Sequence, residues 1–270
     1  MKKTLAFTLV ASVAVITACG GSDGDNTNGT GASAATAGTT ATNAMAPLDA
    51  PCLTAIPGGN RMTATVTVGP VTEVATLEGK AIGQTAFDGK TLDTIEVGLT
   101  GSLMNTRSKT FRFYPNPATV LVPTGVTEYG HGSRTKYRRF DYLNTATGAT
   151  EVPTLLGMQP NETRTFTMVE YQEEAPAANS QPAFDFEARR VKWTVQYVGR
   201  EEVTAMGKQY ANACKLKLRY ERENSPWYTF PTLEGTVWLA PGVGLVKLTG
   251  APVLGVETIS VETSGIVAAN

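Results

Sequence analysis

Apolar and polar residues alternate with a period of two over much of the chain from about residue 47 onward. In residues 62–68 apolar side chains alternate with threonines, and in 192–197 and 214–221 they alternate with charged or polar side chains. Successive side chains of a strand point to opposite faces, so each segment has one apolar face and one polar face. The pattern predicts strands that are buried on one side.

Turn signals recur at short intervals, among them Asp88-Gly89, Pro160-Asn161 and Pro241-Gly242. No window of a dozen residues keeps an uninterrupted apolar stripe of helical period. We therefore predict an all-β fold, a large antiparallel curved sheet of about fourteen to sixteen strands that forms an open barrel or a sandwich. Two similar halves, divided near residues 151–160, would fit the same pattern.

One of these turns has a specific predicted geometry. Pro241 fixes φ at the first central position of a turn, and Gly242 can take the positive φ that a type II turn requires at the second. Gly244 then permits a bulge as the next strand begins. The three residues are predicted to be structural, so that Gly242→Val would damage folding.

Residues 1–18 have the layout of an export signal. Two lysines precede an apolar run from Leu5 to Ile16, which is shorter than the roughly 20 residues that span a bilayer. Ile16-Thr17-Ala18-Cys19 resembles the lipobox of bacterial lipoproteins. The resemblance implies that Cys19 is acylated, for example with palmitate, and anchors the chain to a membrane. The alternative is a conventional cleavage site beside an unmodified Cys19.

Residues 19–46 combine this cysteine with a segment of mainly Gly, Ser, Thr, Ala, Asn and Asp. Such a segment buries too little apolar surface to offset its ordering entropy, which predicts a flexible linker with a span of roughly 25 to 30 Å. Gly20 and Gly21 stand where an aspartate would favour inner-membrane retention in enterobacteria. We therefore expect a periplasmic domain, residues 47–270, held at the outer membrane.

Cys52 and Cys214 are the two thiols that remain after acylation of Cys19. An oxidising periplasm and an even count favour a disulfide between them. Two buried, reduced cysteines are the alternative, because Cys214 lies on the apolar face of its predicted strand.

The last third of the chain carries a family resemblance. Residues 195–204 (VQYVGREEVT), 210–216 (YANACKL) and 235–247 (GTVWLAPGVGLVK) are similar to a group of uncharacterised bacterial envelope lipoproteins. The family motif departs at Met206 to Gln209, and Tyr210 keeps only the aromatic position. The resemblance, which covers about residues 60 to 265, implies a curved β-sheet comparable to lipoprotein carriers of the LolA/LolB type and supplies no catalytic residues.

Candidates for chemistry are few. The single histidine, His131, lies in Gly130-His131-Gly132-Ser133, but the chain has no Gly-x-Ser-x-Gly elbow and Ser133 is poorly placed to use the imidazole. One histidine and two bridged cysteines cannot form a zinc site. We expect no catalytic residues, no metal and no cofactor, and keep an envelope hydrolase that uses this turn as the alternative.

Arg134, Lys136 and Arg138 form the densest positive cluster and would share one face of a strand. They could meet lipid phosphates or an acidic partner; alternatively they are a solvated strand face that resists edge pairing. The formal net charge of −1 argues against nucleic acid as a partner. We expect a non-enzymatic binding or assembly module for an apolar ligand, such as a lipid, or for an envelope protein.

Overall fold

The computed structural model describes most of the chain after the linker. The described residues are 45–53, 60–68, 71–101, 109–114, 125–131, 134–143, 154–175, 189–223, 232–252, 259–264 and 267–268. Cys19, the signal and nearly all of the linker lie outside these ranges, as do Gly132 and Ser133.

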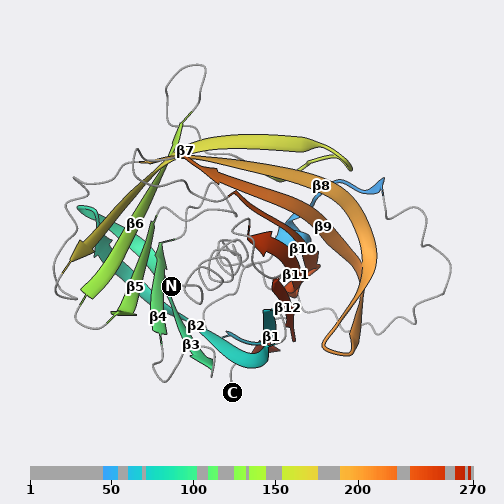
Figure 1. Cartoon of the computed structure of the whole chain (residues 1–270), viewed down its shortest axis with the longest axis horizontal. Coiled ribbons are helices and arrows are strands. Elements are labelled where there is room, and N and C mark those ends of the chain that lie inside the picture. Colours follow the sequence, from blue (N-terminus) through green and yellow to red (C-terminus); the bar gives the residue numbers. More distant parts are fainter. Residues whose placement is uncertain are drawn as a thin grey trace, which may run out of the picture.

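The described residues form one antiparallel sheet that closes on itself (Figure 1). Each strand from β1 to β12 pairs with the next, and β1 also pairs with β12, so that Ala64 lies opposite Thr263. The strands are β1 (Asn60–Val68), β2 (Val71–Phe87), β3 (Lys90–Gly101), β4 (Lys109–Tyr114), β5 (Gly125–His131), β6 (Arg134–Leu143), β7 (Thr163–Ala175), β8 (Arg189–Ala205), β9 (Lys208–Arg222), β10 (Leu233–Ala240), β11 (Gly244–Pro252), β12 (Ile259–Thr263) and β13 (Val267–Ala268), a short strand beside β1.

The all-β, antiparallel, curved sheet predicted from the sequence is confirmed. The sheet is a closed barrel of twelve strands, whereas the sequence suggested an open barrel or a sandwich. Closure satisfies the backbone groups that edge strands would leave unpaired. The described residues contain thirteen strands rather than about fourteen to sixteen, because β2 and β8 run on for 17 residues each.

The alternation of the sequence becomes the inside and the outside of this barrel. Val195 and Tyr197 of β8 are buried and belong to one apolar cluster with Leu216 of β9 and Leu248 of β11. The side chains between them, such as Lys192 and Lys217, are exposed. We call the face that carries the buried cluster the inner face.

The β2–β3 hairpin has a kink and a separate small core at its tip. The strand pairing shifts between Ala81 and Gln84, around Gly83 with its φ of 76°. Beyond this bulge Phe87 stacks on Tyr114, with ring centroids 4.1 Å apart, and packs with Tyr137. A Cβ on Gly125 would lie 2.3 Å from the Phe87 ring, so a glycine is required there.

The β8–β9 hairpin repeats this arrangement six strands later. Its pairing shifts after Tyr197 and after Glu201, and Val203 and Tyr210 near its tip pack against Val246 of β11. Both hairpins turn through two residues with positive φ, Asp88-Gly89 and Met206-Gly207. Residues 154–160 belong to the connection between β6 and β7 and fall within the boundary expected between two halves. Among the described residues, no helix is long and apolar enough to cross a membrane.

Candidate functional site

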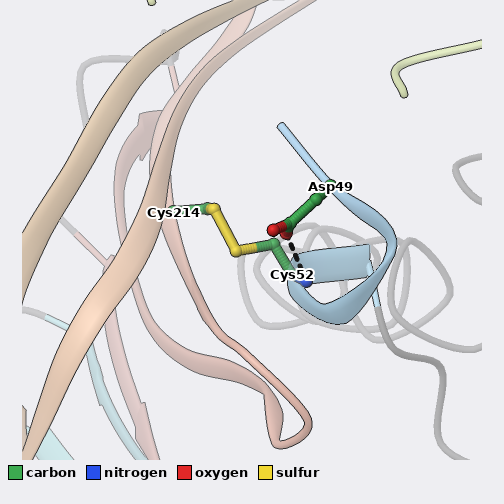
Figure 2. A group of neighbouring side chains, drawn as sticks. All are labelled: Asp49, Cys52 and Cys214. Atoms are coloured by element: carbon green, nitrogen blue, oxygen red, sulfur yellow. Dashed lines mark hydrogen bonds between the residues drawn. A yellow bond between two sulfur atoms is a disulfide. The ribbon is translucent and has the colours of Figure 1, made fainter. Parts of the chain in front are cut away.

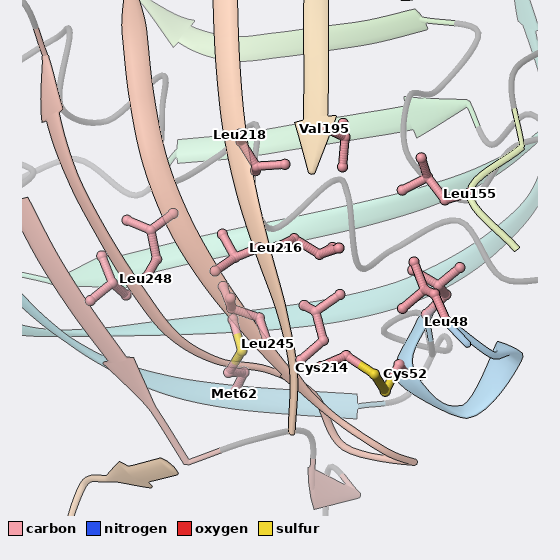
Figure 3. Packing of buried hydrophobic residues seen from close by; sticks show 14 of the residues in the cluster. Leu48, Cys52, Met62, Leu155, Val195, Cys214, Leu216, Leu218, Leu245 and Leu248 are labelled. Carbon is pink, nitrogen blue, oxygen red and sulfur yellow. A yellow bond between two sulfur atoms is a disulfide. The ribbon is translucent and has the colours of Figure 1, made fainter. Parts of the chain in front are cut away.

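The inner wall of the barrel is apolar over most of its described length. Figure 3 shows Leu216, Leu218, Leu245, Leu248 and Val195 gathered from β8, β9 and β11. The wall at β10 and β11 also carries a pair of glycines, Gly235 opposite Gly250. Side chains of an eight-stranded barrel can just fill its interior, and the diameter grows with the number of strands. This barrel has twelve strands, so its diameter is larger than that of an eight-stranded barrel.

One end of the barrel is covered by residues 45–53, here called the plug segment. It contains the 3-10 helix η2 (Ala50–Leu53). The amide of Leu48 donates to the carbonyl of Met158 (2.9 Å), and the amide of Gly242, in the β10–β11 turn, donates to the carbonyl of Pro51 (2.9 Å). The side chains of Leu48, Cys52 and Leu53 are buried in the main cluster.

A disulfide ties the plug segment to the wall. Cys52 is bonded to Cys214 on the inner face of β9, with Cα atoms 6.0 Å apart (Figure 2). This is the pair that the sequence predicts. Asp49 lies beside the bridge, where its carboxylate accepts from the amide of Cys52 (3.4 Å) and pairs with Arg200 Nη2 (2.5 Å). Atoms of Asp49 and the two sulfurs lie within 4.8 Å of one another, but both sulfurs are used by the disulfide.

A charged cluster interrupts the apolar wall where β6 to β9 run together. Glu170 of β7 is buried, with 2% of its surface exposed. Its Oε2 lies 3.3 Å from Nε of Arg222, and its Oε1 lies 3.9 Å from Nε of Arg138. Arg189 stands directly opposite Glu170 in the β7–β8 register. We call Arg138, Glu170, Arg189 and Arg222 the inner arginine cluster.

The register explains why these four residues share a face. Met168 and Val191 are both buried in the main cluster and lie opposite one another. Glu170 is two residues after Met168, and Arg189 is two residues before Val191. Because β7 and β8 are antiparallel, this places Glu170 and Arg189 opposite one another on the inner face. Arg222 lies opposite Val191 on the other side of β8. The cluster therefore has three guanidinium groups and one carboxylate among the described residues.

Two aromatic side chains join the cluster to the apolar wall. Tyr220 donates a hydrogen bond to Glu170 Oε2 (3.2 Å) and meets Trp193 edge to face, with ring centroids 5.1 Å apart. Burial and the negative charge of Glu170 raise the pKa of Tyr220 well above its usual value, although Arg222 and Arg138 act in the opposite direction. Tyr220 therefore stays protonated at neutral pH and remains a hydrogen-bond donor.

The plug segment and the inner arginine cluster lie at different heights in the barrel. Cys214 and Arg222 are eight residues apart on β9, which corresponds to about 26 Å along an extended strand. Leu216, Leu218 and Tyr220 occupy the inner positions between them. The inner face thus runs from a covered apolar end to a region rich in arginine. Such a surface can hold an apolar chain with an anionic group at one end.

The predicted positive patch is only partly a surface feature. Arg134, Lys136 and Arg138 are in strand β6, but Arg138 is three-quarters buried and pairs with Glu170 inside the barrel. Arg138 lies two residues from Phe140 and therefore on the same face of β6, and Phe140 packs against the main cluster. β6 pairs with β5 and with β7, so it is not an edge strand. The side chains of Arg134 and Lys136 lie outside the described part.

The Pro241-Gly242 turn agrees with its predicted geometry, with one correction. The amide of Val243 donates to the carbonyl of Ala240 (3.0 Å), and Gly242 has a φ of 71°, as the third residue of a type II turn requires. Gly244 also has a positive φ, 79°. The bulge does not lie at Gly244, however. It lies at Val246, because Leu239 is paired with Leu245 and Trp238 with Lys247.

Other predicted positions have less structural detail. His131 ends β5 opposite Arg134, and its side chain lies outside the described part together with Ser133. Sequence reasoning did not identify Glu170, Arg189 or Arg222 as members of a site. The sequence does contain a signal for them. Each of these charged residues stands at a position where the period-two alternation of its strand calls for an apolar side chain, as in Phe166-x-Met168-x-Glu170.

Comparison with known proteins gives distant structural neighbours. No protein-family model and no curated protein matches the chain. A "putative exported protein with YmcC-like fold" from Bacteroides fragilis is similar at 12% identity and a TM-score of 0.38. A "putative lipoprotein" from Parabacteroides distasonis is similar at 12% identity and a TM-score of 0.33. Each alignment covers 78% of this chain and 96% of the other. The site described above rests on this chain's own residues.

Proposed function

We propose that the protein is a lipid-anchored envelope lipoprotein whose barrel binds an amphiphile, an apolar chain with a negatively charged head group. The anchor is Cys19, the linker of residues 19–46 separates it from the barrel, and the outer membrane is the proposed location. The proposed role is non-enzymatic. Like the LolA/LolB-type carriers to which the sequence was compared, the protein would bind an apolar chain without altering it.

The inner arginine cluster is the observation that carries this proposal. A purely structural apolar barrel has no need of three arginines on its inner wall, since buried charge is costly unless it is paired. Glu170, with 2% of its surface exposed, is the carboxylate that pairs with Arg138 and Arg222 among the side chains that the structure describes. An anionic head group would add a second acceptor for the guanidinium groups, and its apolar chain would lie along Leu218 and Leu216 toward the plug segment.

The test uses the full chain with Cys19→Ala, which removes the anchor and allows purification from the soluble fraction without detergent. Native mass spectrometry should detect a bound mass that remains after gel filtration, and solvent extraction should identify it as an acyl compound with an acidic head. A protein with no bound mass, which also fails to take up an added long-chain fatty acid, would contradict the proposal.

A further inference from the structure

A second feature lies on the outer face of the barrel, away from the inner arginine cluster. Strands β7 to β11 form a hollow of about 570 Å³ there, which we call the outer groove. Polar side chains form one part of its lining, namely the threonines 163, 194, 236 and 249, together with Gln196 and Lys217. Leu218, Gly235 and Gly250 form an apolar part.

The strand register aligns these side chains in one row. Thr163 lies opposite Gln196, Gln196 opposite Lys217, Lys217 opposite Thr236, and Thr236 opposite Thr249. Neighbouring strands are about 4.8 Å apart, so the row presents a hydrogen-bonding group at regular steps across five strands. All five side chains are exposed or half-buried, and a ligand can reach them from solvent.

The floor of the groove is formed where two strands approach closely. Gly235 and Gly250 lie opposite one another in the inward phase of their strands, and because they carry no side chains their backbone also lines the groove from outside. A Cβ on Gly250 would lie 2.7 Å from the Glu234 carbonyl oxygen, and one on Gly235 would lie 3.1 Å from the Thr249 carbonyl oxygen. Side chains at these positions would push the strands apart, so the glycines maintain the shape of the floor.

Three charged residues line the groove, Lys217, Arg219 and Glu234. Arg219 pairs with Glu234 (2.9 Å) and with Glu221 (2.9 Å). Lys217, in the middle of the row, makes no ion pair within the described part of the chain. Its ammonium group is therefore available to an anion from solution, with hydroxyl and amide groups on both sides.

We infer that the outer groove binds an acidic oligosaccharide. Sugar hydroxyls would exchange hydrogen bonds with the threonines and Gln196, and a sugar carboxylate would pair with Lys217. An apolar ligand would leave these polar groups without partners, which is unfavourable. The volume lies within the range of small-ligand sites. The inference is independent of the amphiphile proposed for the barrel interior.

The test measures binding of a defined oligogalacturonate to the full chain in detergent micelles by isothermal titration calorimetry. Binding should weaken as salt is added, because it depends on an exposed charge. Lys217→Gln should weaken it about tenfold, the effect of losing one charge-assisted hydrogen bond. The double variant Thr236→Val, Thr249→Val should weaken it by a similar factor. Lys80→Gln, on an exposed part of β2, is the matched control and should bind like the wild type.

The inference is wrong if oligogalacturonate does not bind, if a neutral dextran of equal length competes as well, or if Lys80→Gln and Lys217→Gln have equal effects. Circular dichroism and thermal unfolding should show that the variants are folded. Substitution of Arg189 in the barrel interior should leave glycan binding unchanged. The glycan proposal for the outer groove and the amphiphile proposal for the interior are therefore tested independently.

Discussion

Arg222 on β9 and Glu170 on β7 are separated by a whole strand in the barrel wall, yet Arg222 Nε lies 3.3 Å from Glu170 Oε2. Their side chains therefore meet across the inner face of β8, the strand that lies between them. Such a reach is possible because both residues are in the inward phase of their strands. The contact joins three strands around one buried carboxylate and places positive charge inside the barrel.

The Cys52–Cys214 disulfide should stabilise the barrel by restraining the unfolded chain. The bond joins residues 162 apart in sequence, for which the chain-entropy model gives roughly 5 kcal/mol. The double variant Cys52→Ala, Cys214→Ala should therefore unfold at lower urea concentration than the wild type. Two thiols that react with iodoacetamide in the native, non-reduced protein would contradict the bridge.

Gly242→Val should destabilise the protein without altering the ligand sites. The φ of 71° is a left-handed conformation, which costs a side-chain-bearing residue about 1 to 2 kcal/mol. A Cβ at Gly242 would have no atom within 4 Å, so the loss comes from the backbone alone. Asparagine tolerates this conformation, and Gly242→Asn should recover most of the loss in urea unfolding. Equal losses in the two variants would be inconsistent with this reason.

Cys19→Ala should move the protein from the membrane fraction to the soluble fraction, or leave an unprocessed precursor. Acyl chains hold a protein at a membrane by about 0.8 kcal/mol per buried methylene, and the variant has none. Fractionation of cells followed by immunoblotting checks this. An unchanged membrane fraction would mean that the anchor lies elsewhere.

The stability of the β8–β9 hairpin should depend on acid pH through Glu201. Its burial raises the pKa, but a hydrogen bond from Trp238 Nε1 (2.6 Å) and the ion pair with Lys215 lower it by more, so the pKa lies below its usual value. A carboxyl with a depressed pKa in the folded state stabilises the fold above its unfolded pKa, about 4.3, and this contribution disappears as pH falls through the folded value.

The measurement compares the unfolding free energy of the wild type and Glu201→Gln from pH 7 to pH 3. The difference between them should be constant above about pH 5 and should shrink toward acid pH. Glu202→Gln is the control, because Glu202 is exposed and accepts only a long hydrogen bond from Gln209 (3.4 Å). A Glu201→Gln difference that does not change with pH would contradict the argument.

Local sequence pattern predicts the strands well because burial follows the period of two. The inner residues of β8 and β9, such as Tyr197 and Leu216, were recognisable in this way. The closure of the barrel was not, since it depends on pairing Ala64 with Thr263, and a local pattern contains no information on partners so distant in sequence. The inner arginine cluster was missed for the same reason: its members come from four strands, and their register brings them together.

Arg189 and Arg190 offer the most direct test of the central claim, because they are neighbours on β8 that face opposite sides of the barrel wall. Arg189 lies opposite Glu170 on the inner face, and Arg190 is exposed. The measurement is the affinity of the Cys19→Ala chain for a long-chain fatty acid and for the alcohol of the same length. We predict that the acid binds at least about tenfold more tightly than the alcohol, as a charge-assisted contact implies. Arg189→Gln should remove this preference, and Arg190→Gln should keep it. Equal binding of acid and alcohol, or equal effects of the two variants, would contradict the account.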